Sequence, residues 1–270
     1  MDGYIDCHCH LASPEFSKDI GSVITKAKEA GVRCALVVPD LKKELPEVCQ
    51  LAESYPDFIA PALGIHPVQG IPPDDLRSVS AEDFEGVTEF IMKYKEQIVA
   101  VGEIGLDFTP RFIKSEMDKQ TQRDVFRKQI QIAKSLDLPV NVHSRSAGRP
   151  VIELLKSEGA EKVLLHAFDG RPSIAMQGVQ AGYYFSIPPS IVRSEQKQKL
   201  VRQIPLDRLC LETDSPALAA EKQTRNEPCN VRVSCDYIAS IKKVSSEEVR
   251  RATTENALSL FPKLSRFFDR

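Results

Sequence analysis

Short apolar segments recur along the chain and are separated by longer amphipathic ones. The short segments are apolar on both faces, as in the run Cys34–Val38, and this pattern is typical of parallel strands buried between two layers. The predicted strands are Tyr4–Cys7, Arg33–Val38, Ile59–Leu63, Ile98–Gly102, Leu138–Val142, Val163–Leu165, Tyr183–Ile187 and Leu209–Glu212.

The amphipathic segments between these strands predict helices. They are Ile20–Ala30, Leu41–Ser54, Ala81–Lys95, Gln120–Leu136, Pro150–Glu158, Ser173–Ala181, Ser194–Gln203, Cys235–Lys243 and Ser246–Phe261. Strands alternating with helices predict an α/β fold, a (β/α)8 TIM barrel that takes up residues 1–270 as a single domain. A doubly wound open sheet is the alternative, but no Gly-rich phosphate loop follows any predicted strand.

Composition narrows the functional classes. The chain has 270 residues, of which 42% are hydrophobic, and this suffices for a large core and excludes disorder. It has 36 basic and 38 acidic residues, so it is not a uniformly basic nucleic-acid binder. Attraction to a polyanion must therefore be local.

The cysteines indicate the compartment. The chain has seven, an odd number, and Cys34 and Cys210 sit inside apolar runs. We therefore expect reduced thiols in an intracellular protein, cytoplasmic or nuclear and not secreted, because disulfide frameworks belong to oxidising compartments. The sequence shows no secretory signal and no apolar run of the roughly 18 residues that a membrane span needs. We expect a monomer with no membrane partner.

The histidines gather at one end of the predicted barrel. All five lie at or just past the C-terminal end of a predicted strand, where barrel enzymes build their active sites: His8, His10, His66, His143 and His166. Alternate residues of a strand share a face, so His8 and His10 should point together into the barrel mouth while Cys7 and Cys9 face away. A thiolate zinc site through Cys7 and Cys9 is the rival interpretation, but no Cys-x-x-Cys pair completes it.

Two carboxylates complete a candidate metal site. Glu103 ends an apolar run and can bridge two cations, and Asp214 follows the last predicted strand. With four of the histidines, they form the set His8, His10, Glu103, His143, His166 and Asp214. This set suffices for two divalent ions that share Glu103, or for one ion with two further catalytic groups, and Mg, Mn, Co or Zn would suit it. Asp107 either holds a histidine tautomer or caps the next segment.

Other side chains are candidates for contact with substrate. His66 follows the third strand and is suited to donate a hydrogen bond or a proton to a substrate oxygen. Arg145 and Arg225 are candidates to bind a phosphate through the guanidinium group. Asp214 is the candidate to orient the attacking water or accept its proton.

These motifs resemble those of the TatD-related metal-dependent deoxyribonucleases over nearly the whole chain. The resemblance runs through the segments 6–11, 64–67, 102–107, 142–145, 166–170, 212–216 and 254–258. Residues 190–200 and 221–228 look like those of the third vertebrate-type TatD-domain paralogue. Two features depart from the family pattern. Asp169 stands where a serine is frequent, and the loop after Asp214 lacks the usual Pro-x-Arg-Gly stretch.

The resemblance implies a metal-dependent hydrolase barrel with the six ligands above, Glu103 bridging two ions, and His66 near the scissile phosphate. We therefore expect a metal-dependent phosphodiester hydrolase, a deoxyribonuclease acting as a 3′-5′ exonuclease on single-stranded or frayed DNA ends, with Asp214, Glu103 and His66 catalytic. One alternative is a hydrolase of the same superfamily that acts on a small molecule or an aminoacyl ester. The other is a metal-binding scaffold with little turnover.

Overall fold

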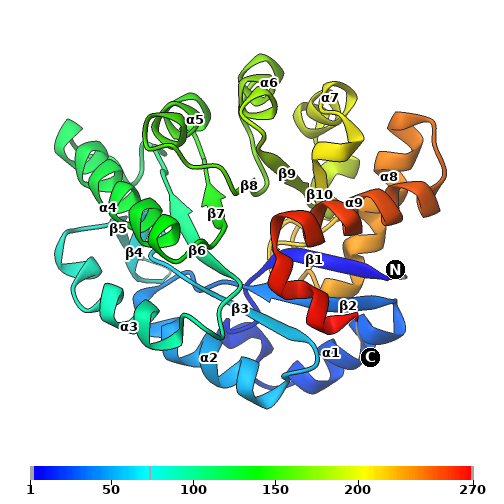
Figure 1. Cartoon of the computed structure of the whole chain (residues 1–270), viewed down its shortest axis with the longest axis horizontal. Helices are drawn as coiled ribbons and strands as arrows, with labels where there is room; N and C mark the ends of the chain where they lie inside the picture. Colours follow the sequence, from blue (N-terminus) through cyan, green and yellow to red (C-terminus); the bar gives the residue numbers. More distant parts are fainter. Residues whose placement is uncertain (1–2, 73, 269–270) are drawn as a thin grey trace.

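The chain forms a barrel of eight parallel strands. The computed structural model describes residues 3–72 and 74–268. Its main sheet has the order β1-β2-β3-β6-β7-β8-β9-β10, with all the paired strands parallel, and the helices surround the sheet as an outer ring (Figure 1). Because strands are paired in their order along the chain, the barrel prediction is confirmed and the doubly wound alternative is excluded.

The observed strands and helices follow the predicted ones closely. The strands are β1 Tyr4–Cys9, β2 Val32–Val37, β3 Ile59–Leu63, β4 Val68–Ile71, β5 Asp75–Ser78, β6 Ala100–Gly105, β7 Val140–His143, β8 Val163–Leu165, β9 Tyr184–Ile187 and β10 Leu209–Leu211. The helices are α1 Ile20–Glu29, α2 Leu45–Ser54, α3 Val87–Tyr94, α4 Glu116–Ser135, α5 Gly148–Ser157, α6 Pro172–Gln180, α7 Glu195–Gln203, α8 Val231–Lys242 and α9 Ser246–Leu260.

Helix α4 shows why some boundaries differ from the prediction. It begins at Glu116, before the predicted start at Gln120, because Ser115 and Asp118 form a capping box. The Ser115 hydroxyl accepts from Asp118 N at 3.3 Å, and Asp118 Oδ2 accepts from Ser115 N at 2.8 Å.

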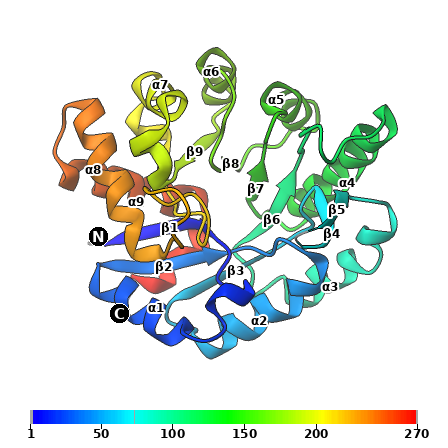
Figure 2. The ribbon, with the colours of Figure 1, turned by 180° about the vertical axis from the view of Figure 1, so that it is seen from behind.

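The structure adds a feature that the sequence pattern missed, the antiparallel hairpin β4–β5 (Figure 2). It lies in the connection between β3 and α3, directly after His66. Its strands have four residues each and carry Gly70 and exposed Ile71 instead of an apolar run, so the pattern looks like a loop.

The barrel closes at its mouth. Strands β1 and β10 share no ladder of the sheet, yet Asp214 N donates to the His8 carbonyl at 2.9 Å and His10 N donates to the Ser215 carbonyl at 2.7 Å. The buried Asp6 carboxylate adds hydrogen bonds from Thr213 N at 2.9 Å and Thr213 Oγ1 at 2.5 Å. The seam therefore joins the two segments that carry His8, His10 and Asp214.

One apolar cluster fills the inside of the barrel. It collects side chains from six strands, α9 and the 3-10 helix Pro262–Phe267: Ile5, Cys7, Cys34, Leu36, Val38, Ala60, Ala62, Val99, Ala100, Leu164, Cys210, Ala257, Leu260, Phe261, Leu264 and Phe267. Cys7 thus lies with the interior residues, and the expectation that it faces away is wrong. The pairing of β1 with β2 is irregular between Asp6 and Cys9, which breaks the simple alternation. Cys9 does pack in the other cluster, between barrel and helices.

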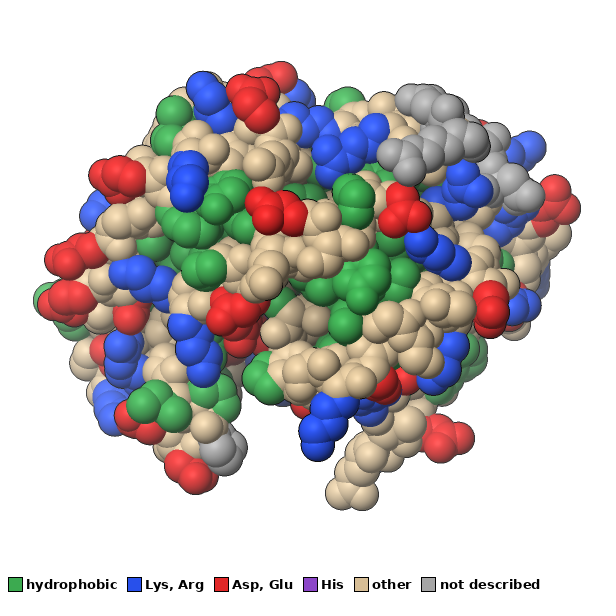
Figure 3. All heavy atoms as spheres, turned by 90° about the horizontal axis from the view of Figure 1, so that it is seen from below, with side chains coloured by type: hydrophobic (Ala, Val, Ile, Leu, Met, Phe, Trp, Pro, Cys, Tyr) green, Lys and Arg blue, Asp and Glu red, His purple; other side chains and the backbone are tan. Residues whose placement is uncertain are grey.

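The seven cysteines are all free in the structure. On the face drawn in Figure 3, acidic and basic side chains are interspersed and not segregated by sign, in keeping with a net charge of −2. Within residues 3–72 and 74–268, no helix has the length and apolar character needed to cross a membrane.

Candidate metal centre

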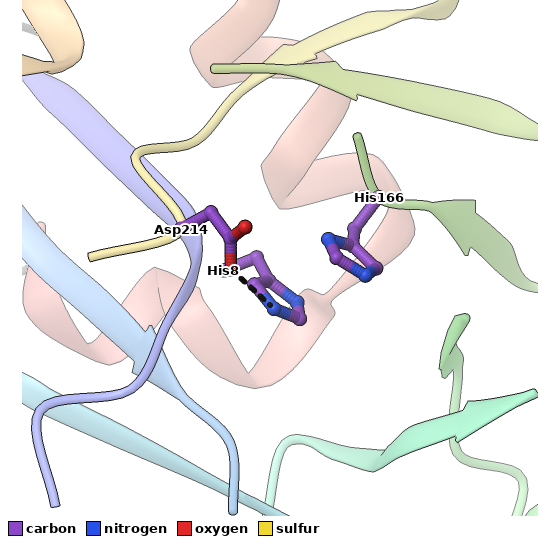
Figure 4. Close-up of side chains that lie close together, drawn as sticks. All are labelled: His8, His166 and Asp214. Carbon is purple, nitrogen blue, oxygen red and sulfur yellow. Dashed lines mark ion pairs between the residues drawn. The ribbon is translucent and has the colours of Figure 1, made fainter. Parts of the chain in front are cut away.

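The C-terminal ends of the strands bring together the predicted ligands. His8 and His10 come from β1 and the residue after it, Glu103 from inside β6, His143 from the end of β7, and His166 and Asp214 from just past β8 and β10. Glu103 lies within its strand and not at its end, because β6 continues to Gly105. Figure 4 shows Asp214, His8 and His166 converging from three separate strands.

Glu103 stands between two groups of nitrogen and oxygen atoms. Its Oε2 lies 3.6 Å from the Nε2 atoms of both His8 and His10, and Asp214 Oδ1 lies 3.4 and 3.2 Å from the same two nitrogens. Its Oε1 lies 2.9 Å from His143 Nδ1 and 2.7 Å from His166 Nε2. One carboxylate thus contributes one oxygen to each group.

These distances fit metal coordination. Ring nitrogens of two neighbouring histidines approach to 3.1 Å in the first group and to 3.2 Å in the second. Tetrahedral bonds of about 2.0–2.1 Å place ligand atoms about 3.3–3.4 Å apart. Lone pairs converging at this spacing suit one divalent cation on each side of Glu103, and the mixture of imidazole and carboxylate suits Mg, Mn, Co or Zn.

Each of these four histidines has an oxygen near the ring nitrogen that faces away from Glu103. His8 Nδ1 lies 2.9 Å from Asn141 Oδ1, and His143 Nε2 lies 3.2 Å from Asp107 Oδ2. His10 Nδ1 is 3.4 Å from Asp40 Oδ1 and His166 Nδ1 is 3.9 Å from Glu212 Oε2, and neither nitrogen has a hydrogen bond among the described residues. Hydrogen-bonded outer partners such as those of His8 and His143 orient the ring of a metal-binding histidine and fix its tautomer.

The tautomers of His8 and His143 follow from these contacts. The Asn141 amide donates through Nδ2 to the Cys7 carbonyl at 2.9 Å, so its oxygen faces His8 and must accept the proton of His8 Nδ1. Asp107 Oδ2 likewise accepts from His143 Nε2. When these two rings are neutral, the nitrogen turned to Glu103 is therefore the one that carries the lone pair. Asp107 also accepts from Thr109 N at 2.8 Å, so it fills both of its predicted roles.

The electrostatics keep both carboxylates ionised. Burial raises the pKa of Glu103, but its electrostatic interactions with the surrounding rings of His166, His66 and His8 and its hydrogen bond with His143 outweigh burial and hold this pKa well below its usual range. Burial acts in the same way on Asp214, and its contacts with His10 and His8 likewise hold its pKa far below normal. Both side chains are then charged acceptors at neutral pH.

The pKa values of His166 and His143 are shifted in opposite directions because their surroundings differ. Burial and the neighbouring His8 lower the pKa of His166 to about 3, so this ring is neutral. Burial also opposes protonation of His143, but its hydrogen bonds to Asp107 and Glu103 raise its pKa to about 10. A cation bound beside His143 would therefore displace a proton.

Glycine allows the strand that carries Glu103 to approach β7 closely. Gly105 has φ +145°, and a Cβ placed there would lie 2.1 Å from the His143 carbonyl oxygen. A Cβ on Gly102 would lie 2.6 Å from the Asn141 side chain. At both positions the backbone of β6 therefore approaches β7 more closely than a residue with a Cβ would allow.

His66 lies at the edge of the same centre. Its Nδ1 lies 3.1 Å from both the N and the O atom of Val68, and its Nε2 lies 3.7 Å from Glu103 Oε1. Burial lowers the pKa of His66 and keeps the ring neutral. The structure therefore places an imidazole nitrogen, Nε2, beside the second group of ligand atoms.

The two predicted arginines have different surroundings. Arg145 is exposed and lines a cavity of about 220 Å³ at the mouth, together with His143, His166 and Asp214. The Arg225 guanidinium instead pairs with Asp19 through two contacts of 3.0 and 2.6 Å and with Glu227 at 2.8 Å. These carboxylates pair with the guanidinium group that was expected to bind a phosphate. The structure therefore does not support a phosphate-binding role for Arg225.

Sequence reasoning missed several polar residues around the centre. Asn141 and Glu212 stand two residues before His143 and Asp214, and the period of two along a strand could have found them. Glu212 is buried against the Ser186 hydroxyl, and burial together with Asp214 raises its pKa to about 8. Asp40 lies in the connection after β2, and no local sequence pattern indicates its position beside His10.

A barrel with this histidine and carboxylate set defines a metal-dependent hydrolase. The family model described as "TatD related DNase" matches residues 5–262. The chain therefore belongs to the TatD-related DNase family, and the resemblance seen in the motifs is confirmed.

Individual relatives agree over their whole lengths. The chain is 58% identical to the human protein named "Deoxyribonuclease TATDN3", over 97% of this chain and 96% of that protein. It is 36% identical to the Bacillus subtilis "Uncharacterized metal-dependent hydrolase YabD", over 95% of this chain and 98% of the relative. The crystal structure of the Escherichia coli TatD homologue YJJV superposes with a TM-score of 0.82 at 29% identity, covering 96% of this chain and 98% of that one. The protein is a TatD-type metal-dependent hydrolase acting on ester bonds.

Proposed function

We propose that this protein hydrolyses phosphodiester bonds of DNA with two divalent cations, acting from the 3′ end of single-stranded or frayed DNA. The observation that carries the proposal is the position of Glu103, whose two oxygens face separate groups of ligand atoms 2.7 to 3.6 Å away. Cations bound there would polarise a phosphate and make water a better nucleophile at neutral pH. The human relative is itself named a deoxyribonuclease.

The residues at the centre would have different roles in the proposed reaction. His8, His10 and Asp214 would hold one cation, His143 and His166 the other, and Glu103 both. Asp214 stays ionised and can orient water or accept its proton. With its proton on Nε2, which faces the same space, His66 would donate a hydrogen bond to a phosphate oxygen.

The charge of the surrounding loops favours a polyanion on one side of the mouth. The neighbouring connections 106–115, 144–147 and 166–171 and the first turn of α5 carry the exposed cationic side chains Arg111, Lys114, Arg145, Arg149 and Arg171, against the exposed Asp169. The connection 64–86 carries Asp74, Asp75, Glu82, Asp83 and Glu85 against Arg77. We infer that a DNA strand approaches over the loops that follow β6, β7 and β8.

The size of the site supports a preference for ends. The cavity beside the candidate ligands measures about 220 Å³, below the roughly 300–1,000 Å³ of typical small-molecule sites. A space this small admits a phosphate with its adjoining sugar but not an intact duplex backbone. We infer that unpaired ends reach the ligand atoms more readily than a stacked double helix does.

The test is cleavage of 5′-labelled oligonucleotides by metal-loaded protein, with Glu103→Gln as the matched inactive variant. We expect a ladder that shortens from the 3′ end, faster on single strands, abolished by chelation and by Glu103→Gln. Rapid cutting of covalently closed single-stranded circles would overturn the preference for ends. Absence of metal-dependent cleavage of any DNA would overturn the proposal as a whole.

A further inference from the structure

One buried cation near the candidate metal centre has no role in the scheme above. Lys197 lies in the first turn of α7 and is only 7% exposed. Lys199, two residues later on the same helix, has a side chain 55% exposed and pairs with Glu195 at 2.8 Å. Lysine is almost never this deeply buried unless its charge is paired.

The ammonium group of Lys197 is incompletely satisfied. Its Nζ donates to the Ala167 carbonyl at 2.9 Å, directly after His166. Within the part of the chain that the structure describes, no carboxylate lies within 4.0 Å of this nitrogen and no second acceptor is bonded to it. An ammonium has three N–H donors, so two of them remain for an outside acceptor.

Those donors belong to a side chain that lines the mouth cavity. The same cavity of about 220 Å³ is bounded by Lys197, Arg145 and the candidate ligands His143, His166 and Asp214. Asp169 also lines it and, with Asp214, supplies negative charge near the lysine. A group bound in this cavity would touch the ligand residues on one side and the lysine on another.

We propose that Lys197 binds a phosphate oxygen of the nucleic-acid substrate in this cavity, beside the cleaved bond. The inference rests on the proposed function and deepens it. Lysine binds phosphate as a compact point charge, and burial strengthens the attraction because little water competes. The cavity, lined by Lys197 and Arg145, then forms the subsite for one phosphate of the strand and its adjoining sugar.

The test variants remove the positive charge of Lys197 and keep the packing of its side chain. Lys197→Met retains the buried hydrocarbon, and Lys197→Gln also retains an N–H donor while losing the charge. Lys199→Met is the matched control, because it makes the same change on the exposed face of α7. Metal-loaded proteins are compared on a single-stranded oligonucleotide at several salt concentrations.

We expect both Lys197 variants to raise KM about 10- to 100-fold, the loss of one charge-assisted hydrogen bond, with a smaller change in kcat. The slope of log(kcat/KM) against log salt should fall by about 0.7, the value for one phosphate contact on a single strand. Lys199→Met should match the wild type in both. A purely structural lysine would lower the melting temperature and leave the salt slope unchanged, and that result would overturn the inference.

A second probe separates this inference from the proposed function. Inorganic phosphate is titrated calorimetrically into the metal-loaded wild type and Lys197→Gln. Weaker phosphate binding to Lys197→Gln supports the lysine site even if the wild type cleaves no DNA. Equal phosphate affinities together with unchanged KM on DNA refute the lysine site while leaving DNA hydrolysis standing.

Discussion

Asp107 offers the sharpest test of how the candidate metal centre is held together. Its Oδ2 accepts from His143 Nε2 at 3.2 Å, and its Oδ1 accepts from Thr109 N at 2.8 Å. In Asp107→Asn the amide oxygen would stay on the fixed main-chain donor of Thr109. The amide NH2 would then face His143 and favour the tautomer with its proton on Nδ1. That proton would occupy the lone pair expected to bind the cation beside Glu103.

The expected loss is confined to one of the two sites. Changing an outer partner of a metal-binding histidine costs about 10- to 100-fold in metal affinity, or about 1.4–2.7 kcal/mol. The group formed by His8, His10 and Asp214 makes no contact with Asp107 among the described residues, so its affinity should be unchanged.

The assay is calorimetric titration of Mn²⁺ or Zn²⁺ into metal-stripped protein, fitted to two sites. Asp118→Asn is the control, because it makes the same chemical change at a helix cap far along the chain from the histidines. Wild-type affinity at both sites in folded Asp107→Asn would refute the tautomer argument. An equal loss at both sites would refute it too, since it would mean that Glu103 itself had moved.

Four further outcomes are expected. Glu103→Gln should release both cations, seen by metal analysis, and lower turnover about a hundredfold or more; retention of two ions would contradict the bridging role. Arg145→Ala should raise KM on DNA and lessen its salt dependence, whereas Arg225→Ala should lower the melting temperature without a comparable rise in KM. Phe261→Ala, in the barrel interior, should lower the free energy of unfolding in urea by about 3–5 kcal/mol. Metal affinity should rise about tenfold per pH unit between pH 6 and 8, because the cation displaces a proton from His143, whose pKa is about 10; a pH-independent affinity would argue against this.

The strands and the candidate metal ligands could be predicted from the sequence for the same reason. A strand buried on both faces must be apolar throughout, so a histidine or carboxylate at its end stands out against the pattern. His143 and His166 are such cases, and both reach the centre. The hairpin β4–β5 was missed because an exposed four-residue strand carries no apolar run.

Contacts between distant parts of the chain account for the wrong or missing expectations. Arg225 pairs with Asp19, which lies 206 positions away in the sequence. No sequence feature near Arg225 predicts this contact. The orientation of Cys7 depended on an irregular pairing between β1 and β2 that no single strand reveals. The burial of Lys197, in contrast, could have been predicted from the local sequence. Lys197 precedes Leu200 and Val201 by three and four residues, so it shares the buried face of α7.

The charge of the mouth explains why extra cationic side chains are needed. Two divalent cations with Glu103 and Asp214 alone would leave about two positive charges. The structure adds Asp107 beside His143, ionised because its hydrogen bonds, chiefly those from His143, lower its pKa to about 2 against the effect of burial. These three carboxylates would offset three of the four positive charges, Asp40 beside His10 and Asp169 in the cavity are further carboxylates nearby, and Glu212, with its pKa near 8, adds little more at neutral pH. In the proposed reaction, attraction of a phosphodiester would therefore come in part from Lys197 and Arg145, which line the same cavity, so their removal should weaken substrate binding more than it weakens metal binding.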